Sequence, residues 1–222
     1  MKIAILGRGK TGHKVNEVAL AKGHETTVFH SENTPTTKKL IGHDVIISFL
    51  PGPALATFLE ILKDAKLPIV SGSTGFDFST ITELTWVQGH NYALGMNIVR
   101  EMIAVLSKAP NILGENYSCH IHEVHHVKKL DSPSGTALRW KDWSGLKGDI
   151  TSERQGDVVG DHIITVKTDT EEITLRHQAL DRKIFAEGAL WMAAKLIESP
   201  MKNGFYWFEN IVQSELGIKD NK

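Results

Sequence analysis

The segment from His120 to Ala137 concentrates side chains that handle protons and carboxylates. Its polar members include His120, His122, His125, His126, Lys129, Ser132, Ser134 and Thr136. Imidazole groups donate protons near neutral pH, and a lysine supplies a positive charge. A helix that begins after Pro133, capped by Ser132 or Ser134, presents free backbone N–H groups to an anion. We therefore expect Gly135 and Thr136 to bind a carboxylate of a small acidic substrate, with Lys129 close by.

Two other interpretations of the same histidines remain open at this point. Imidazole is a good zinc ligand, so a metal site is the first alternative. The His-x-His pair has no obvious third ligand, however, and Lys129 would repel a cation. The second alternative is a strand whose histidines only satisfy their own hydrogen bonds. Alternation on such a strand places Glu123 and His125 on one face and His120 and His122 on the other. We expect a substrate site without a metal.

A second chemical motif lies at the start of the chain. The residues Gly7-Arg8-Gly9-Lys10-Thr11-Gly12 match the pattern G-x-G-x-x-G, directly after an apolar strand and at the start of a helix. In such a loop the glycines permit a tight turn, close approach of a pyrophosphate and close packing of helix on strand. The pattern predicts a dinucleotide site formed by these six residues.

The choice between NADH and NADPH is left open by the sequence. The second strand ends at Phe29, and His30, Ser31 and Glu32 follow. No carboxylate stands at the strand tip to bind a ribose 2′-hydroxyl unless Glu32 reaches back, whereas His30 and Ser31 are able to accept a 2′-phosphate. We expect His30 to contact the cofactor.

The elements that position these motifs follow a βα alternation at first. Strands are expected at 3–6, 26–29, 44–49 and 68–71, with helices at 12–22 and 54–63. Such an alternation predicts a parallel sheet covered by helices. After about residue 97 the pattern changes to a helix at 98–108, a strand at 119–127, a helix at 134–143, a hairpin at 161–168 and 171–178, and helices at 182–198 and 206–216.

These patterns predict an α/β protein with two domains. A Rossmann-like dinucleotide-binding domain is expected at 1–97 plus 181–222. An inserted α+β domain at 98–180 is expected to bind the substrate and to form oligomers. In the helix at 98–108, the expected buried face carries Ile98, Met102, Val105 and Leu106.

Composition narrows the functional class. The 222 residues contain 25 Lys and Arg against 26 Asp and Glu, a net charge of −1, which gives no reason to expect nucleic acid or an anionic membrane as partner. Cys119 is the lone cysteine, so no internal disulfide is expected. No apolar run reaches the ~18 residues of a membrane span. We expect a cytoplasmic enzyme.

The histidine segment resembles the 4-hydroxy-tetrahydrodipicolinate reductase (dihydrodipicolinate reductase) family of lysine and diaminopimelate biosynthesis. The family pattern E-x-H-H-x-x-K-x-D-x-P-S-G-T-A is met by Glu123, His125, His126, Lys129, Asp131, Pro133, Ser134, Gly135, Thr136 and Ala137. Weaker matches occur along the whole chain. They are the turn Gly72-Ser73-Thr74-Gly75-Phe76, the segment Asn91 to Asn97, the stretch Ser152-Glu153-Arg154 with Gly160 and His162, and Arg182 to Gly188.

The resemblance implies a reaction and a role for each matched residue. A hydride from NADPH or NADH would reduce a cyclic imine that carries two carboxylates. By position, His125 would be the proton donor, Lys129 would hold the substrate and stabilise charge, His126 would line the pocket, and Gly135 and Thr136 would bind a carboxylate. Gly72, Ser73, Thr74, Asn91 and Tyr92 would contact the cofactor. The family also implies a homotetramer built from the sheet of the inserted domain, and no metal.

The chain departs from the family pattern in its cofactor loop, Ser48-Phe49-Leu50. Ser48 stands in place of an acidic residue and Leu50 in place of a Ser or Thr, while Phe49 is the family's residue. Two other functions remain as alternatives. One is a nicotinamide dehydrogenase that acts on another amino or keto acid. The other is a nucleotide-binding sensor without turnover, which the pairing of His125 with Lys129 disfavours.

Overall fold

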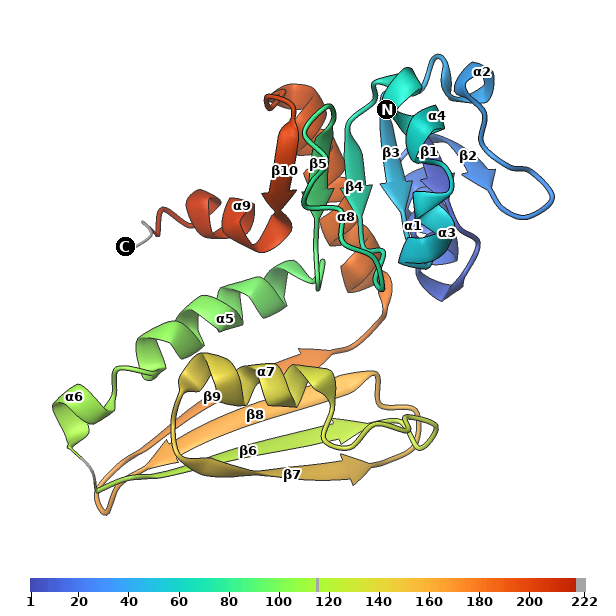
Figure 1. Ribbon diagram of the computed structural model, residues 1–222. Coiled ribbons are helices and arrows are strands. Elements are labelled where there is room, and N and C mark those ends of the chain that lie inside the picture. The colour runs from blue at the N-terminus through green and yellow to red at the C-terminus, as the bar shows by residue number, and fades with distance from the viewer. Residues whose placement is uncertain (115, 219–222) are drawn as a thin grey trace. The chain divides into compact units, whose positions relative to one another are not determined.

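A computed structural model describes residues 1–114 and 116–218, which form two compact units (Figure 1). One unit comprises Met1–Leu94 with Arg182–Lys222, and the other comprises Gly95–Asp181. These boundaries differ by a few residues from those expected from the sequence. Residues 219–222, which the sequence assigns to the first domain, lie outside the described residues. The expected α/β class is confirmed, because one unit is Rossmann-like and the other is α+β.

The first unit is built on a six-stranded parallel sheet with the strand order β10-β5-β4-β3-β1-β2. Its strands are β1 (Lys2–Leu6), β2 (Glu25–Phe29), β3 (Val45–Ser48), β4 (Ile69–Ser71), β5 (Thr85–Gln88) and β10 (Gly204–Trp207). Every residue of β3 and β4 is buried, as expected for parallel strands that are covered on both faces.

Helices pack on both faces of this sheet and divide its core into two clusters. They are α1 (Lys10–Ala21), α2 (Thr37–Leu40), α3 (Gly52–Ala56), α4 (Leu59–Ala65), α8 (Lys183–Glu198) and α9 (Phe208–Glu215). Along β1, Ile3 and Ile5 join the cluster that includes residues of α1, α8 and α9, while Ala4 and Leu6 join the cluster formed with α2 to α4. The alternation along one short strand therefore stabilises both layers.

The second unit contains a four-stranded sheet with the order β7-β6-β8-β9. Its elements are α5 (Leu94–Leu106), α6 (Pro110–Leu113), β6 (Ser118–His125), α7 (Gly135–Ser144), β7 (Gly148–Arg154), β8 (Gly160–Lys167) and β9 (Glu172–Ala179). Figure 1 shows α7 lying along one face of this sheet. Trp140 of α7 is fully buried, and its indole N–H donates to Sδ of Met96 at 3.3 Å.

The structure corrects several local expectations. Tyr206 and Trp207 belong to β10 and not to a helix, because they pair with Val87 and Gln88 of β5. The helix expected at 54–63 is divided into α3 and α4, and β5 and β7 were not expected.

The buried face of α5 also differs from expectation. Met96, Val99 and Ile103 are buried together with Leu106, whereas Ile98, Met102 and Val105 are exposed. Among the described residues, no helix combines the length and the apolar character needed to cross a membrane.

Candidate active site

The glycine loop of the first unit has the geometry that a dinucleotide-binding turn requires. Gly7 has φ of +110°, a conformation that favours glycine, and α1 begins directly after Gly9. A Cβ on Gly12 would lie 2.1 Å from the carbonyl oxygen of Gly7, so only glycine allows this close approach of helix and loop. A Cβ on Gly9 would meet no protein atom within 4 Å, which leaves open space beside the N-terminus of α1.

The positive end of α1 faces this space without a competing carboxylate. The first turn of α1 contains no acidic residue, and Arg8 and Lys10 are exposed beside it. A helix N-terminus with free N–H groups and no anionic neighbour attracts phosphate oxygens. The loop from Gly7 to Gly12 therefore fits the pyrophosphate of a dinucleotide.

An apolar pocket lies beside the end of β2, where the expected cofactor residue His30 is found. Its volume is about 340 Å³. It is lined by Leu6, Phe29, His30, Ser31, Thr34, Pro35, Leu50, Ala54, Thr57 and Phe58. The size and apolar lining suit the flat ring of an adenine. Lys39 of α2 donates to Oδ1 of Asn33 and to the carbonyl of Thr34 in the adjoining loop.

A second pocket of about 310 Å³ gathers residues from five separate segments of the first unit. Its lining comprises Thr11, Phe49, Gly72, Gly89, His90, Asn91, Tyr92 and Phe185. Four of the expected cofactor residues thus line one cavity, namely Thr11, Gly72, Asn91 and Tyr92. Ser73 and Thr74 line a neighbouring cavity of about 240 Å³ together with Gly75 and Phe76. Both cavities suit parts of the same extended cofactor.

The departure at Ser48-Phe49-Leu50 is accommodated locally. Oγ of Ser48 lies 3.2 Å from Oγ of Ser73, and the ring of Phe49 packs edge-on against Tyr92. A Cβ on Gly72 would lie 2.3 Å from the Phe49 ring. The Phe49 ring in this position therefore requires glycine at residue 72. Phe49, which keeps the family's residue between the departures Ser48 and Leu50, is a pocket residue that the sequence did not mark as a cofactor contact.

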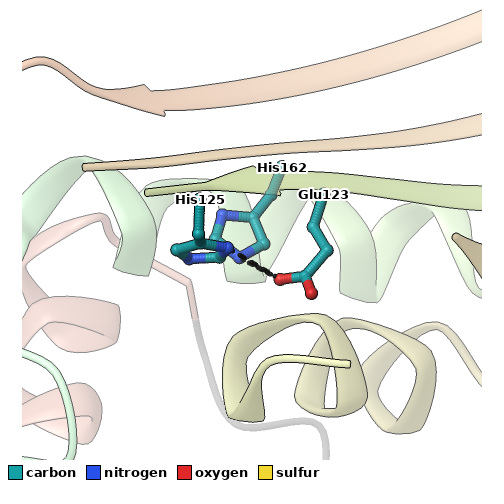
Figure 2. A group of neighbouring side chains, drawn as sticks. All are labelled: Glu123, His125 and His162. Atoms are coloured by element: carbon teal, nitrogen blue, oxygen red, sulfur yellow. Dashed lines mark ion pairs between the residues drawn. The ribbon is translucent and has the colours of Figure 1, made fainter. Parts of the chain in front are cut away.

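In the second unit, His125 is held by a buried carboxylate. Nδ1 of His125 lies 2.9 Å from Oε2 of Glu123, and the Glu123 side chain is fully buried (Figure 2). Both residues lie on the inward face of β6, as the alternation predicts. Within the described residues neither of these two atoms has a hydrogen-bond partner, so their contact is a close charge contact without hydrogen-bond geometry.

His162 and Arg154 complete the cluster from the two strands beside β6. His162 of β8 lies opposite Glu123 in the register, and Arg154 of β7 lies opposite His125. Nε2 of His162 is 3.8 Å from Oε2 of Glu123 and 3.2 Å from Oγ of Ser134. The guanidinium of Arg154 donates to Oε1 of Glu123 at 3.3 and 3.4 Å.

The expected carboxylate site is a capped helix start. Oγ of Ser134 accepts from the N–H of Ala137 at 3.1 Å, which identifies Ser134 and not Ser132 as the N-cap of α7. Gly135 is exposed, and a Cβ there would meet no atom within 4 Å. Thr136 is half-buried.

Lys129 lies in the loop between β6 and α7. Its Nζ is 2.8 and 2.9 Å from the two carboxylate oxygens of Asp131. Lys129 has the largest effect in lowering the pKa of the Asp131 carboxyl, and the backbone of Gly135 acts in the same direction. The Asp131 carboxylate therefore interacts with both groups that are expected to bind a substrate carboxylate. His126 precedes Lys129, and its carbonyl accepts from the Lys129 N–H at 3.0 Å.

The cluster shifts the protonation of its members. Burial lowers the pKa of His125; Glu123 opposes this shift, whereas Lys129 and Arg154 add to it. Burial lowers the pKa of His162 from 6.5 to about 4, so His162 is neutral at pH 7. Burial acts to raise the pKa of Glu123, but hydrogen bonds from Ser134 and Ser152 outweigh it and the pKa is lowered. Glu123 is therefore charged.

Glu123, His125 and His162 are of types that bind metals, and their ligand atoms lie within 4.8 Å of one another. The positive charges of Arg154 and Lys129 beside them disfavour a cation. The hydrogen bonds to Ser134 and Arg154 already use several of the same side-chain atoms. We interpret the cluster as a network that handles protons.

Three comparisons with known proteins bear on this site. A family model described as dihydrodipicolinate reductase, C-terminus, matches residues 95–212. The chain is 33% identical to 4-hydroxy-tetrahydrodipicolinate reductase of Thermosipho africanus over 96% of this chain and 98% of that one. It is 30% identical to the enzyme of the same name from an Exiguobacterium species over 96% of each.

A solved structure has the same fold. Dipicolinate-bound dihydrodipicolinate reductase from Paenisporosarcina sp. TG-14 superimposes with a TM-score of 0.72 at 20% identity. The match covers 95% of this chain and 99% of that one.

Proposed function

The chain belongs to the dihydrodipicolinate reductase family, and we propose on this basis that it reduces 4-hydroxy-tetrahydrodipicolinate to tetrahydrodipicolinate. The reaction adds one hydride and one proton and releases one water. When bound, the nicotinamide supplies the hydride. The chain's own residues must orient a small dianion, stabilise its charge and provide the proton.

His125 is the proton donor in this proposal. Its Nδ1 faces Glu123 at 2.9 Å, so a proton passed to the substrate leaves from Nε2. A lowered pKa makes the imidazolium a ready donor, and the two carboxylates of the substrate favour that charged form while it is bound.

Lys129, Gly135 and Thr136 bind the substrate carboxylates in this proposal, and His126 lines the same pocket. The observation that carries the proposal is that the Glu123 and His125 pair, the Lys129 loop and the capped start of α7 all lie within the segment matched by the family model. A carboxylate at the start of α7 would replace or share the contacts that Asp131 makes with Lys129 and Gly135.

The cofactor is NADPH or NADH in this proposal. The end of β2 offers His30 and Ser31 in place of the carboxylate that selects a free 2′-hydroxyl. Neither residue excludes a ribose without a 2′-phosphate, so both cofactors are expected to support turnover.

We also propose a homotetramer formed through the sheet of the second unit, in the cytoplasm. Both β7 and β9 are edge strands, and such edges pair or pack with other chains. Light scattering of the purified protein measures the assembly, and a monomer would contradict it.

The test of the reaction is a coupled assay in which the preceding synthase makes the unstable substrate in place. Oxidation of NADH and NADPH is followed in parallel, before and after dialysis of the protein against EDTA. We expect turnover with both cofactors and no loss after dialysis.

The alternatives predict different results in the same assay. Cofactor oxidation with other amino or keto acids, but not with the synthase product, would indicate a different dehydrogenase. Cofactor binding without turnover on either kind of substrate would indicate a sensor. Loss of activity on dialysis that zinc restores would indicate a metal at the histidine cluster.

A further inference from the structure

We propose that Glu123 is a positioning residue that holds the proton donor, the lysine loop and the carboxylate-binding helix start in one arrangement. This inference depends on the function proposed above. Glu123 is fully buried on the central strand β6, and its two oxygens face different partners. Each of these contacts leads to a different part of the candidate site.

The first contact orients the imidazole. Oε2 of Glu123 lies 2.9 Å from Nδ1 of His125, a charge contact without hydrogen-bond geometry. The negative oxygen repels a lone pair on Nδ1 and favours a hydrogen there. Nε2 is then the atom that gains and loses a proton. His125 has little freedom to turn away, because its ring packs edge-on against His162 with ring centres 4.9 Å apart.

The second contact fixes the helix start. Oε1 of Glu123 accepts from the backbone N–H of Ser134 at 2.9 Å. Ser134 caps α7 through its side chain, so its backbone position determines where the N–H groups of the first turn point. The same carboxylate group that holds His125 thus also sets the location of Gly135 and Thr136.

The third contact reaches the lysine loop through Arg154. The guanidinium that donates to Oε1 of Glu123 also donates to the carbonyl of Lys129 at 3.3 Å and to the carbonyl of Asp131. Its remaining donor contact is with the carbonyl of Glu153 at 2.7 Å. Arg154 thereby ties the backbone on both sides of Leu130 to the buried carboxylate.

The charged groups around His125 make the role of Glu123 measurable. Lys129, Arg154 and His162 oppose a positive charge on His125 when they are themselves charged, and Glu123 and Asp131 favour it. Replacing Glu123 with glutamine removes the nearest negative charge but keeps the size and an acceptor oxygen. A glutamate that only filled space would leave the protonation of His125 unchanged.

The test compares Glu123→Gln with the wild-type protein in the coupled assay. We expect kcat to fall by roughly 10- to 100-fold, because the proton donor is misdirected while other binding groups remain. We also expect the basic limb of kcat/KM against pH to move to lower pH, with the dissociation constant for NADPH within about twofold of wild type. Glu172→Gln is the matched control, since Glu172 is an exposed residue of β9 in the same sheet.

A second measurement does not depend on the variant being folded. In wild-type protein labelled with ¹⁵N-histidine, the His125 signals are assigned by their loss in His125→Gln. The neutral ring is expected to carry its hydrogen on Nδ1, and a hydrogen on Nε2 would refute the proposed contact. Glu123→Asp retains the charge, and it is expected to keep the wild-type pH limb with a smaller loss of kcat.

The outcomes separate this inference from the function on which it depends. Absence of turnover by the wild-type protein refutes the proposed function. Turnover by wild type together with unchanged kcat and an unchanged pH profile in a folded Glu123→Gln refutes the positioning role alone.

Discussion

Gly12 lies so close to Gly7 that a Cβ on Gly12 would be 2.1 Å from the carbonyl oxygen of Gly7. This distance is far below any van der Waals contact, so the backbone of the loop would have to move. Gly9, in the same loop, has no protein atom within 4 Å of an added Cβ. The two glycines therefore have different requirements, and alanine substitutions distinguish them.

We expect Gly9→Ala to keep the wild-type melting temperature but to weaken NADPH binding at least about tenfold, because its methyl group would enter the space for the pyrophosphate. Gly12→Ala is expected to lose both stability and binding. Thermal unfolding and fluorescence titration with NADPH measure the two effects. Normal NADPH binding by Gly9→Ala would show that the phosphates do not lie on this loop.

His125→Gln is expected to lower kcat by roughly two to four decades, the usual contribution of a general acid. Cofactor affinity should change little, because the glycine loop belongs to the first unit. His120→Gln is the control, since His120 is exposed on the opposite face of β6. Full turnover by His125→Gln would overturn its role as proton donor.

The pH dependence of the wild-type protein gives an independent check on His125. Because the pKa of this residue is lowered from 6.5, kcat/KM is expected to fall with rising pH at a pH below 6.5. The corresponding limb of kcat should lie at higher pH, since bound carboxylates favour the imidazolium. His125→Gln should remove the decline with pH from both kcat/KM and kcat. A decline that persists in this variant would show that another group titrates.

Lys129→Ala is expected to raise KM and to lower kcat, because the ammonium group both captures a carboxylate and stabilises charge during the reaction. Lys141→Ala serves as the control, since Lys141 lies in the last turn of α7, away from the helix start. Steady-state kinetics at several substrate concentrations separate the two constants. Unchanged kinetics in Lys129→Ala would remove this residue from the site.

Burial of His162 predicts a loss of stability in acid. Its pKa is about 4 in the folded protein and 6.5 when unperturbed, so the unfolded chain binds more protons between these values. The free energy of unfolding should therefore decrease as the pH falls from 6.5 to 4, by about 3 kcal/mol from this residue. Urea unfolding at several pH values measures the slope of the unfolding free energy against pH. His162→Gln should reduce this slope, whereas the control His120→Gln should leave it unchanged.

Much of the candidate site follows from local sequence. The alternation along β6 places Glu123 and His125 on one buried face, and the Ser-Gly-Thr turn predicts the start of α7. The glycine spacing predicts the turn between β1 and α1. Each of these features depends on residues within a few positions of one another.

The contacts of Glu123 with Arg154 and His162 could not be predicted from local sequence. Arg154 and His162 reach it through the register of β7 and β8 with β6, and such pairing depends on contacts far apart in the chain. Both residues stand in segments that match the family, which is the one signal that marks them. The same limit explains β10, where pairing with β5 overrides the helical pattern of Tyr206 and Trp207.

The guanidinium of Arg154 spans Glu123, Glu153 and the backbone of Lys129 and Asp131, which leaves this loop few alternative conformations. The conformational entropy of the loop is therefore largely lost when the chain folds, before any substrate arrives. Such a preorganised site allows a small dianion to bind without a further ordering penalty in this segment.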